Sequence, residues 1–163
     1  MRTIKLEPLT VEAFAPFGSF TDVMNPSGPH LCGEFHTFYR DGARHFSDGQ
    51  LPMGFSPLVV KNHGYRVDSV EYHTHSCEGI MPINDDAVLH VTPAGGAPDT
   101  TATKAFLVPK GTIVSLYPGV YHLTPLPRHE AELHALVVLP ERAYANDFAL
   151  VELDEESAFE IEV

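Results

Sequence analysis

The sequence predicts an all-β fold, an antiparallel sandwich or barrel, with one short helix near the N-terminus. From about residue 55, apolar segments of four to six residues recur at roughly ten-residue spacing, with turn signals between them. The 163 residues include 12 glycines and 14 prolines, which divide the chain into short segments. Many short strands at this spacing are typical of closed or packed antiparallel sheets.

The length and composition indicate a single domain. A chain of 163 residues with 44% hydrophobic residues can bury a sizeable core, and no repeat or linker divides it. We expect an N-terminal helix with flanking strands over about 1–55 and the main barrel over about 56–142. For the acidic tail over about 143–163, the sequence leaves three alternatives: an edge strand, a short helix or a dimer contact.

The predicted helix lies within residues 9–18. Thr10 is a suitable N-cap, and Pro16 and Gly18 end the helix after one or two turns. The predicted strands follow in order over residues 58–60, 67–74, 87–91, 105–108, 112–116 and 135–139.

The charge restricts the binding partners, and the cysteine content indicates the cellular compartment. Ten Lys and Arg residues against 22 Asp and Glu residues give a formal charge of −12, which disfavours nucleic acids and anionic membrane surfaces. No apolar run approaches the roughly 20 residues of a membrane span, and the first residues lack signal-peptide features. Only two cysteines, Cys32 and Cys77, are present, so we expect a reduced cytoplasmic location.

A group of histidines and acidic residues carries the strongest functional signal. Glu71, His73 and His75 alternate along a predicted strand, so their side chains can share one face. Downstream, the Pro118-Gly119 turn precedes His122. Two or three imidazoles with a carboxylate suit a divalent transition metal such as zinc, nickel, manganese or iron. A metal-free pocket made of the same residues is the alternative.

The pairing of His73-x-His75 with a later Pro-Gly-x-x-His122 resembles the cupin superfamily. This resemblance implies a double-stranded β-helix barrel in which these three histidines and one carboxylate bind the metal. The family template favours Glu78 as that carboxylate, whereas strand alternation favours Glu71.

A narrower resemblance covers most of the chain. The opening over residues 7–18, the segment from Glu71-x-His73 to Pro82, and the pattern over residues 105–126 resemble the ureidoglycolate lyase family in order and spacing. At five places the chain departs from that pattern: His75, Glu78, Tyr121, Lys61-Asn62 and the spacing from His122 to Pro125, which is one residue longer. These departures make the site more similar to a metal-binding cupin.

The lyase resemblance implies elimination of urea from ureidoglycolate, a step of allantoin degradation in purine metabolism. The carboxylate that does not bind the metal, Glu71 or Glu78, would act as acid or base. Lys61 or Arg66 would pair with the carboxylate of a small anionic substrate. Tyr117 and Tyr121 would donate a hydrogen bond or form the pocket wall.

Two other functions remain open from the sequence. One is a metal-dependent cupin isomerase or lyase that acts on another sugar acid or hydroxy acid. The other is a non-catalytic cupin that binds a small ligand. Both resembled families are usually homodimeric, so the resemblance also implies a homodimer.

Overall fold

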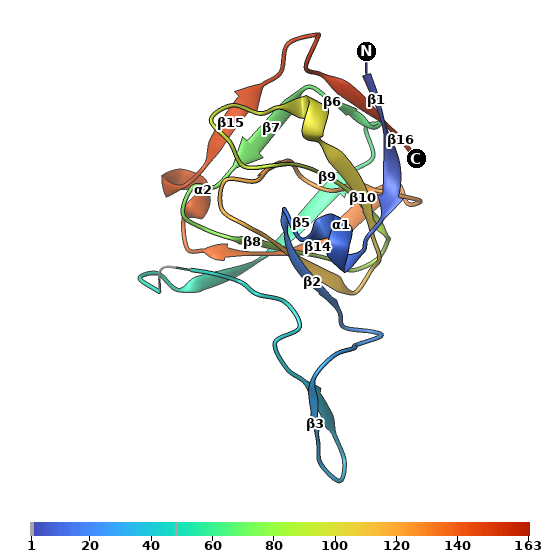
Figure 1. Cartoon of the computed structure of the whole chain (residues 1–163), viewed down its shortest axis with the longest axis vertical. Coiled ribbons are helices and arrows are strands. Elements are labelled where there is room, and N and C mark those ends of the chain that lie inside the picture. The colour runs from blue at the N-terminus through green and yellow to red at the C-terminus, as the bar shows by residue number, and fades with distance from the viewer. Residues whose placement is uncertain (1, 48) are drawn as a thin grey trace.

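A computed structural model describes residues 2–47 and 49–163 (Figure 1). Nearly all regular structure is β, and a strongly curled sheet forms most of the barrel, which confirms the predicted all-β, cupin-like barrel class. Two larger sheets face each other across the interior, and a separate hairpin projects away from them.

The first sheet contains strands from both ends of the chain. In spatial order its strands are β15 (Ala149–Glu152), β7 (Ser69–Tyr72), β12 (Tyr121–His122), β9 (Ala87–Thr92), β10 (Lys104–Val108), β1 (Arg2–Pro8), β16 (Phe159–Glu162) and β6 (Arg66–Val67), with β13 (Leu126–Pro127) beside β9. The parallel pairing of β1 with both β10 and β16 joins the N-terminus to the C-terminal tail.

The second sheet forms the opposite wall. Its order is β2 (Gly18–Asp22), β11 (Thr112–Leu116), β8 (Glu78–Pro82), β14 (Glu132–Pro140) and β5 (Met53–Lys61). Val137 of β14 pairs with Ile80 on one side and with Ser56 on the other. Because side chains alternate along a strand, Glu78 lies on the same face of this sheet as Ile80.

The predicted N-terminal helix is present as α1 (Val11–Phe14). The Thr10 hydroxyl accepts a hydrogen bond from the Ala13 N–H at 3.2 Å, as expected of an N-cap. Phe14 is fully buried, and its ring meets Phe106 edge-on with centroids 5.4 Å apart. The helix therefore closes one end of the core. A further single turn, η1 (Thr100–Ala102), precedes β10.

The acidic tail forms both a helix and strands. After β14 the chain makes the four-residue α2 (Ala143–Asn146) and then β15, which is an edge strand paired with β7. β16 pairs with β1 and β6. Two of the three open possibilities for the tail, a short helix and an edge strand, therefore occur together.

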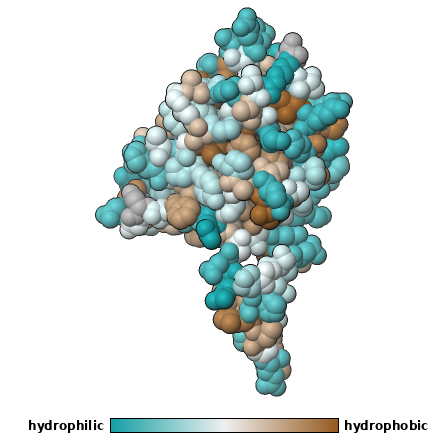
Figure 2. All heavy atoms as spheres, viewed as in Figure 1, coloured by the Kyte–Doolittle hydropathy of each residue, from teal (hydrophilic) through white to brown (hydrophobic). Residues whose placement is uncertain are grey.

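A hairpin of β3 (His30–Cys32) and β4 (Thr37–Tyr39) extends far from the barrel (Figure 1). We call residues 23–47 the arm. Figure 2 shows hydrophobic side chains on it, and the exposed ones include Leu31, Phe35 and Phe38, with Phe35 89% exposed. Among the described residues, no helix has the length and apolar character needed to cross a membrane.

Candidate functional site

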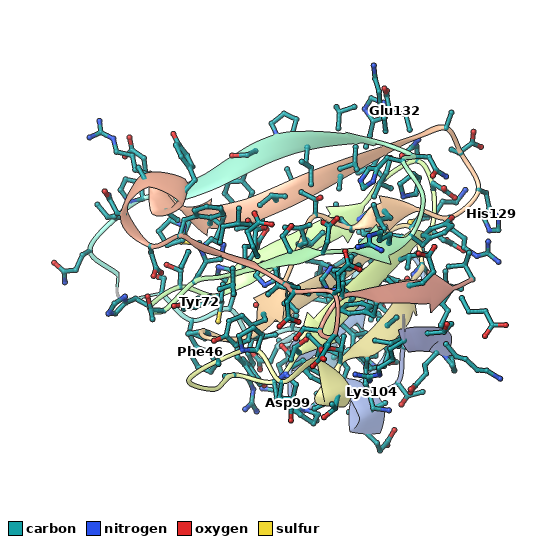
Figure 3. All side chains as sticks on the ribbon, turned by 90° about the horizontal axis from the view of Figure 1, so that it is seen from above. Phe46, Tyr72, Asp99, Lys104, His129 and Glu132 are labelled. Carbon is teal, nitrogen blue, oxygen red and sulfur yellow. The ribbon has the colours of Figure 1, made fainter. Side chains whose placement is uncertain are left out.

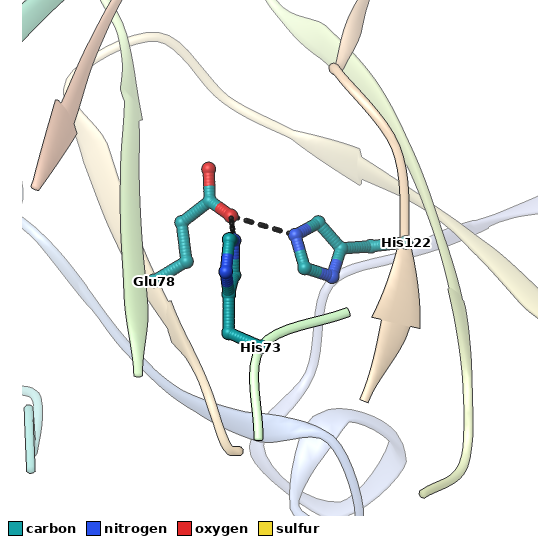
Figure 4. Close-up of side chains that lie close together, drawn as sticks. All are labelled: His73, Glu78 and His122. Atoms are coloured by element: carbon teal, nitrogen blue, oxygen red, sulfur yellow. Dashed lines mark hydrogen bonds and ion pairs between the residues drawn. The ribbon is translucent and has the colours of Figure 1, made fainter. Parts of the chain in front are cut away.

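His73, Glu78 and His122 converge on one point inside the barrel (Figure 4). The Nε2 atoms of His73 and His122 lie 3.0 and 2.7 Å from the same oxygen, Oε2 of Glu78. All three side chains are buried, and their potential ligand atoms lie within 4.8 Å of one another. Three of the residues expected to bind a metal thus form one cluster.

A break between two strands brings Glu78 into this cluster. β7 ends at Tyr72 and β8 begins at Glu78, so strand alternation does not continue from Glu71 to Glu78. The intervening loop turns the chain, and Glu78 enters the interior from the second sheet. The carboxylate favoured by the cupin template therefore contacts both histidines.

Hydrogen bonds to backbone carbonyls set the orientation of both imidazoles. Nδ1 of His122 donates to the carbonyl oxygen of Val120 at 2.9 Å, and Nδ1 of His73 donates to that of Asp147. Because a carbonyl oxygen only accepts, the proton resides on Nδ1, and Nε2 is the atom that faces Glu78. This is the usual arrangement of histidines that bind a metal through Nε2.

The charges in the cluster are mutually dependent. Burial acts to raise the pKa of Glu78, but the imidazoles of His122 and His73 lower it to about 2. Burial likewise acts to lower the pKa of each histidine, and the Glu78 carboxylate raises both. The carboxylate is therefore ionised, and it favours positive charge on the two Nε2 atoms. A divalent cation could replace the two protons with the same total charge, so the donor set fits a transition metal.

Glu71 lies beside the cluster as a second carboxylate. It is opposite His122 in the pairing of β7 with β12, and its Oε1 is 4.0 Å from Nε2 of His122. Burial raises the pKa of Glu71, although the neighbouring histidines act in the opposite direction. The Glu71 side chain is 16% exposed, so a small ligand in the interior can reach its carboxylate. At 4.0 Å from Nε2 of His122, that carboxylate is not directly bonded to the cluster.

The structure does not bring His75 to the cluster. Its side chain is 82% exposed, and Nδ1 lies 3.4 Å from Oδ1 of Asp147. The alternation that placed it with His73 requires a strand, and β7 ends at Tyr72, one residue before His73. His75 is therefore not among the three clustered ligand atoms.

The two cations expected to bind substrate lie elsewhere. Lys61 is exposed at the end of β5, opposite Glu132 in register, and Figure 3 shows Glu132 at a rim of the barrel away from Tyr72. Arg66 forms ion pairs with Asp68 at 3.6 Å and Glu155 at 3.4 Å. Neither side chain reaches the His–Glu cluster.

The two expected tyrosines form walls. The hydroxyl of Tyr121 donates to the carbonyl oxygen of Gly95 at 3.1 Å, and its ring packs against Tyr72 with centroids 4.8 Å apart. Tyr117 is half-buried, with its ring 6.2 Å from that of Phe46, which Figure 3 labels. These contacts explain both tyrosines as packing residues.

A pocket of about 340 Å³ is lined by the buried Glu78 and by the exposed Glu141, Arg142 and Tyr144, which mark the side that we call the barrel mouth. Its lining residues come from β5, β8, β14, the loop between β12 and β13, the segment before α2 and α2 itself: Gly54, Ser56, Pro57, Leu58, Glu78, Thr124, Val137, Leu139, Pro140, Glu141, Arg142 and Tyr144. Thr124, Arg142 and Tyr144 carry polar groups in this pocket that sequence reasoning missed. No local motif marks them, because the pocket forms only when distant strands close the barrel.

Comparison with known proteins gives a consistent result. A family model described as ureidoglycolate lyase matches residues 1–161. The chain is 33% identical over 135 residues to a putative ureidoglycolate lyase of Agrobacterium fabrum, covering 77% of each chain. It is 30% identical over 139 residues to the ureidoglycolate lyase of Pseudomonas syringae pv. tomato, covering 75% of this chain and 74% of that protein. It is 28% identical over 128 residues to the ureidoglycolate lyase of Rhodobacter capsulatus, covering 75% of this chain and 77% of that protein.

Proposed function

The chain belongs to the ureidoglycolate lyase family, and on that premise we propose that it eliminates urea from ureidoglycolate to give glyoxylate. Within the site, one arrangement of side chains supports this proposal. The buried His73–Glu78–His122 cluster has a second carboxylate, Glu71, next to it, and a pocket leads to it from the barrel mouth. Such a pair of differently placed carboxylates suits proton transfer beside a charged centre.

The reaction requires one proton transfer and one bond cleavage. The reacting carbon of ureidoglycolate bears a hydroxyl, a carboxylate and the ureido nitrogen. The hydroxyl loses its proton, a C=O bond forms, and the C–N electron pair leaves with the nitrogen. The nitrogen then takes a proton, so urea and glyoxylate account for every atom of the substrate.

We assign this proton transfer to Glu71. It is close to the cluster without bonding directly to Glu78, so its carboxylate is available to the substrate. Glu71 would accept the hydroxyl proton and return it to the departing nitrogen, which lies on the same carbon. Glu78 is unsuited to this role, because both histidines bond to its Oε2.

We propose that Nε2 of His73, Nε2 of His122 and the carboxylate of Glu78 hold a divalent zinc, nickel, manganese or iron ion. When bound, such an ion lowers the pKa of a substrate hydroxyl and stabilises negative charge on its oxygen. The carbonyl acceptors at Val120 and Asp147 would keep both imidazoles oriented for that ion.

The function is tested by product analysis. Purified protein without a polyhistidine tag is assayed with ureidoglycolate, and urea, ammonia and glyoxylate are measured together. We expect equimolar urea and glyoxylate without ammonia, and we expect chelation to abolish turnover. N-carbamoylglycine, which lacks the hydroxyl, is the matched control and should not react. Ammonia in place of urea would contradict the lyase assignment, and turnover of a different hydroxy acid or sugar acid would contradict the substrate.

We further propose that the active form is a homodimer, with the arm of each copy packed on the other. Leu31, Phe35 and Phe38 are exposed on the arm, and Phe55 and Val59 are exposed on β5. Exposed apolar clusters of this kind mark protein interfaces. Light scattering should give twice the chain mass, and Phe35→Ser with Phe38→Ser should give the monomer. A monomeric parent protein would contradict this proposal.

We place the enzyme in the cytoplasm and in allantoin degradation. Both cysteines, Cys32 and Cys77, are free, and Cys32 is exposed. An exposed free thiol is typical of a reducing compartment. Fractionation of the producing cells should recover the protein with cytoplasmic markers, and recovery elsewhere would contradict the location. Failure of a deletion strain to grow on allantoin as nitrogen source would support the pathway.

A further inference from the structure

The pocket that leads to Glu78 has one cationic side chain among its described lining residues, that of Arg142. The walls are mostly apolar, with Leu58, Val137 and Leu139 along the two strands. Arg142 lies at the mouth, after the end of β14, whereas Glu78 lies in the interior. The pocket therefore presents the Glu78 carboxylate at its inner end, and the Arg142 guanidinium with its neighbour Glu141 at its outer end.

The backbone holds Arg142 in place at this mouth. Its φ of 64° and ψ of 20° are in the left-handed region, which few residues other than glycine adopt. Its carbonyl oxygen accepts hydrogen bonds from the N–H groups of Ala145 and Asn146, at 2.9 and 3.1 Å. On the preceding side, the Glu141 N–H donates to the Pro52 carbonyl at 2.8 Å. These bonds fix the position from which the side chain extends.

The guanidinium of Arg142 is available for a ligand. Its ion pair with Glu141 runs through Nε at 3.8 Å and is solvent-exposed, the Arg142 side chain being 73% exposed. Within the described part of the chain, its two terminal nitrogens form no hydrogen bond. Two parallel N–H groups of a guanidinium match the two oxygens of a carboxylate.

Arg142 gives the pocket a place where a ligand carboxylate meets a cation. Among the described lining residues, the other charged side chains, Glu78 and Glu141, are acidic. Arg142 is therefore the lining side chain that can pair with a ligand carboxylate. We propose that Arg142 binds the carboxylate of the substrate and thereby directs the hydroxyl and ureido groups toward Glu71 and the His–Glu cluster. The identity of the substrate rests on the proposed function; the carboxylate specificity rests on the pocket.

The test compares three variants of Arg142 with a control. Arg142→Gln removes the charge, Arg142→Lys keeps it without the paired N–H groups, and Arg142→Gly also removes it but adopts a positive φ freely. Lys5→Gln, at an exposed position of β1, makes the same charge change outside both the pocket lining and the arm. Steady-state kinetics with ureidoglycolate and with its primary amide are measured for each, together with calorimetric binding of glyoxylate.

We expect Arg142→Gln and Arg142→Gly to raise KM for ureidoglycolate about 10- to 100-fold, as for loss of a charge-assisted hydrogen-bond pair. Preference for the acid over the amide should fall by a similar factor, and Arg142→Lys should lie between. Lys5→Gln should match the parent protein. If Arg142→Gln fails to fold, Arg142→Gly carries the test.

The outcomes separate this inference from the proposed function. Parent-like KM, acid preference and glyoxylate binding in Arg142→Gly would overturn the assignment of Arg142, even with normal urea release. If the parent protein releases no urea but binds glyoxylate with an affinity that Arg142→Gly loses, the carboxylate site is supported and the substrate is wrong.

Discussion

Glu71 lies directly across the β7–β12 pair from His122, with its Oε1 4.0 Å from Nε2 of that histidine. This distance is longer than a hydrogen bond, whereas Nε2 of the same histidine is 2.7 Å from Oε2 of Glu78. One carboxylate is thus bonded into the cluster and the other stands beside it. The two acidic residues should therefore differ in function.

Glu71→Gln and Glu78→Gln should separate metal binding from proton transfer. Glu78→Gln removes a ligand and should lose most of the bound metal, whereas Glu71→Gln should retain it. Glu71→Gln should lower kcat about 10²- to 10⁴-fold, as expected for removal of a general base. Elemental analysis and turnover of the same preparations check both expectations. Metal loss in Glu71→Gln with retention in Glu78→Gln would reverse the two roles.

The two buried histidines should be required for metal content, and His75 should not. His73→Ala and His122→Ala each remove one Nε2 ligand, so bound metal should fall at least about tenfold. His75→Ala is the matched control from the same loop, and because its side chain is exposed it should keep the parent metal content. Metal content is measured by mass spectrometry after dialysis, with circular dichroism to confirm folding. Stoichiometric metal in both His73→Ala and His122→Ala would refute these ligands.

The sequence predicts a structural feature correctly when that feature depends on residues close together in the chain, and it fails when the feature depends on distant ones. Thr10 caps α1 as expected, because an N-cap acts over three residues. The orientation of His75 depends instead on Asp147, more than seventy residues away. The Asp147 carboxylate bonds to the backbone of Thr74 and His75 and so holds the chain in a loop where alternation predicts a strand.

The same distinction explains why the sequence pointed to Lys61, and not to Arg142, as a cation of the pocket. Lys61 is close to the apolar strand that suggested it, but the barrel places that strand end at a rim. Arg142 has no motif around it, and it becomes a pocket residue only because β14 and β5 bring the chain to the barrel mouth. Pairings between distant strands, such as these, cannot be inferred from periodicity alone.

Asp147 should stabilise the loop that carries His73. Its Oδ1 accepts from the N–H and hydroxyl of Thr74, each at 2.7 Å, and its Oδ2 accepts from the His75 N–H at 3.0 Å. Asp147→Ala removes these three bonds and the longer contact with Nδ1 of His75 from a largely buried carboxylate, and should lower the free energy of unfolding by about 2–4 kcal/mol. Chemical denaturation measures this, and amide exchange at Thr74 and His75 should accelerate.

Asp154→Ala is the control for that loss. Asp154 accepts a hydrogen bond from the Ser157 N–H at 2.8 Å, but in an exposed turn between β15 and β16. Its removal should lower the unfolding free energy by less than about 1 kcal/mol and should leave exchange at Thr74 unchanged. Equal losses in the two variants would show that Asp147 has no special effect on the site loop.

His90 should make the protein sensitive to acid. It is buried in β9 with its ring 5.5 Å from that of Phe159, and in the described structure its Nδ1 has no hydrogen-bond partner. Burial, with a smaller contribution from the charge of His122, lowers the pKa of His90 to about 3. The unfolded chain therefore takes up a proton below about pH 6.5 that the folded chain does not.

The sign of the pH dependence follows from that difference. The contribution of neutral His90 is complete above about pH 6.5 and is lost as pH falls toward 3, by at most about 1.4 kcal/mol per pH unit. His90→Leu removes the titrating group without breaking a hydrogen bond, so its unfolding free energy should fall less steeply with acid. Urea denaturation between about pH 7 and about pH 4.5 measures both slopes. His63→Leu, at an exposed turn, should keep the parent slope. Equal slopes in His90→Leu and the parent protein would mean that another buried group accounts for the acid sensitivity.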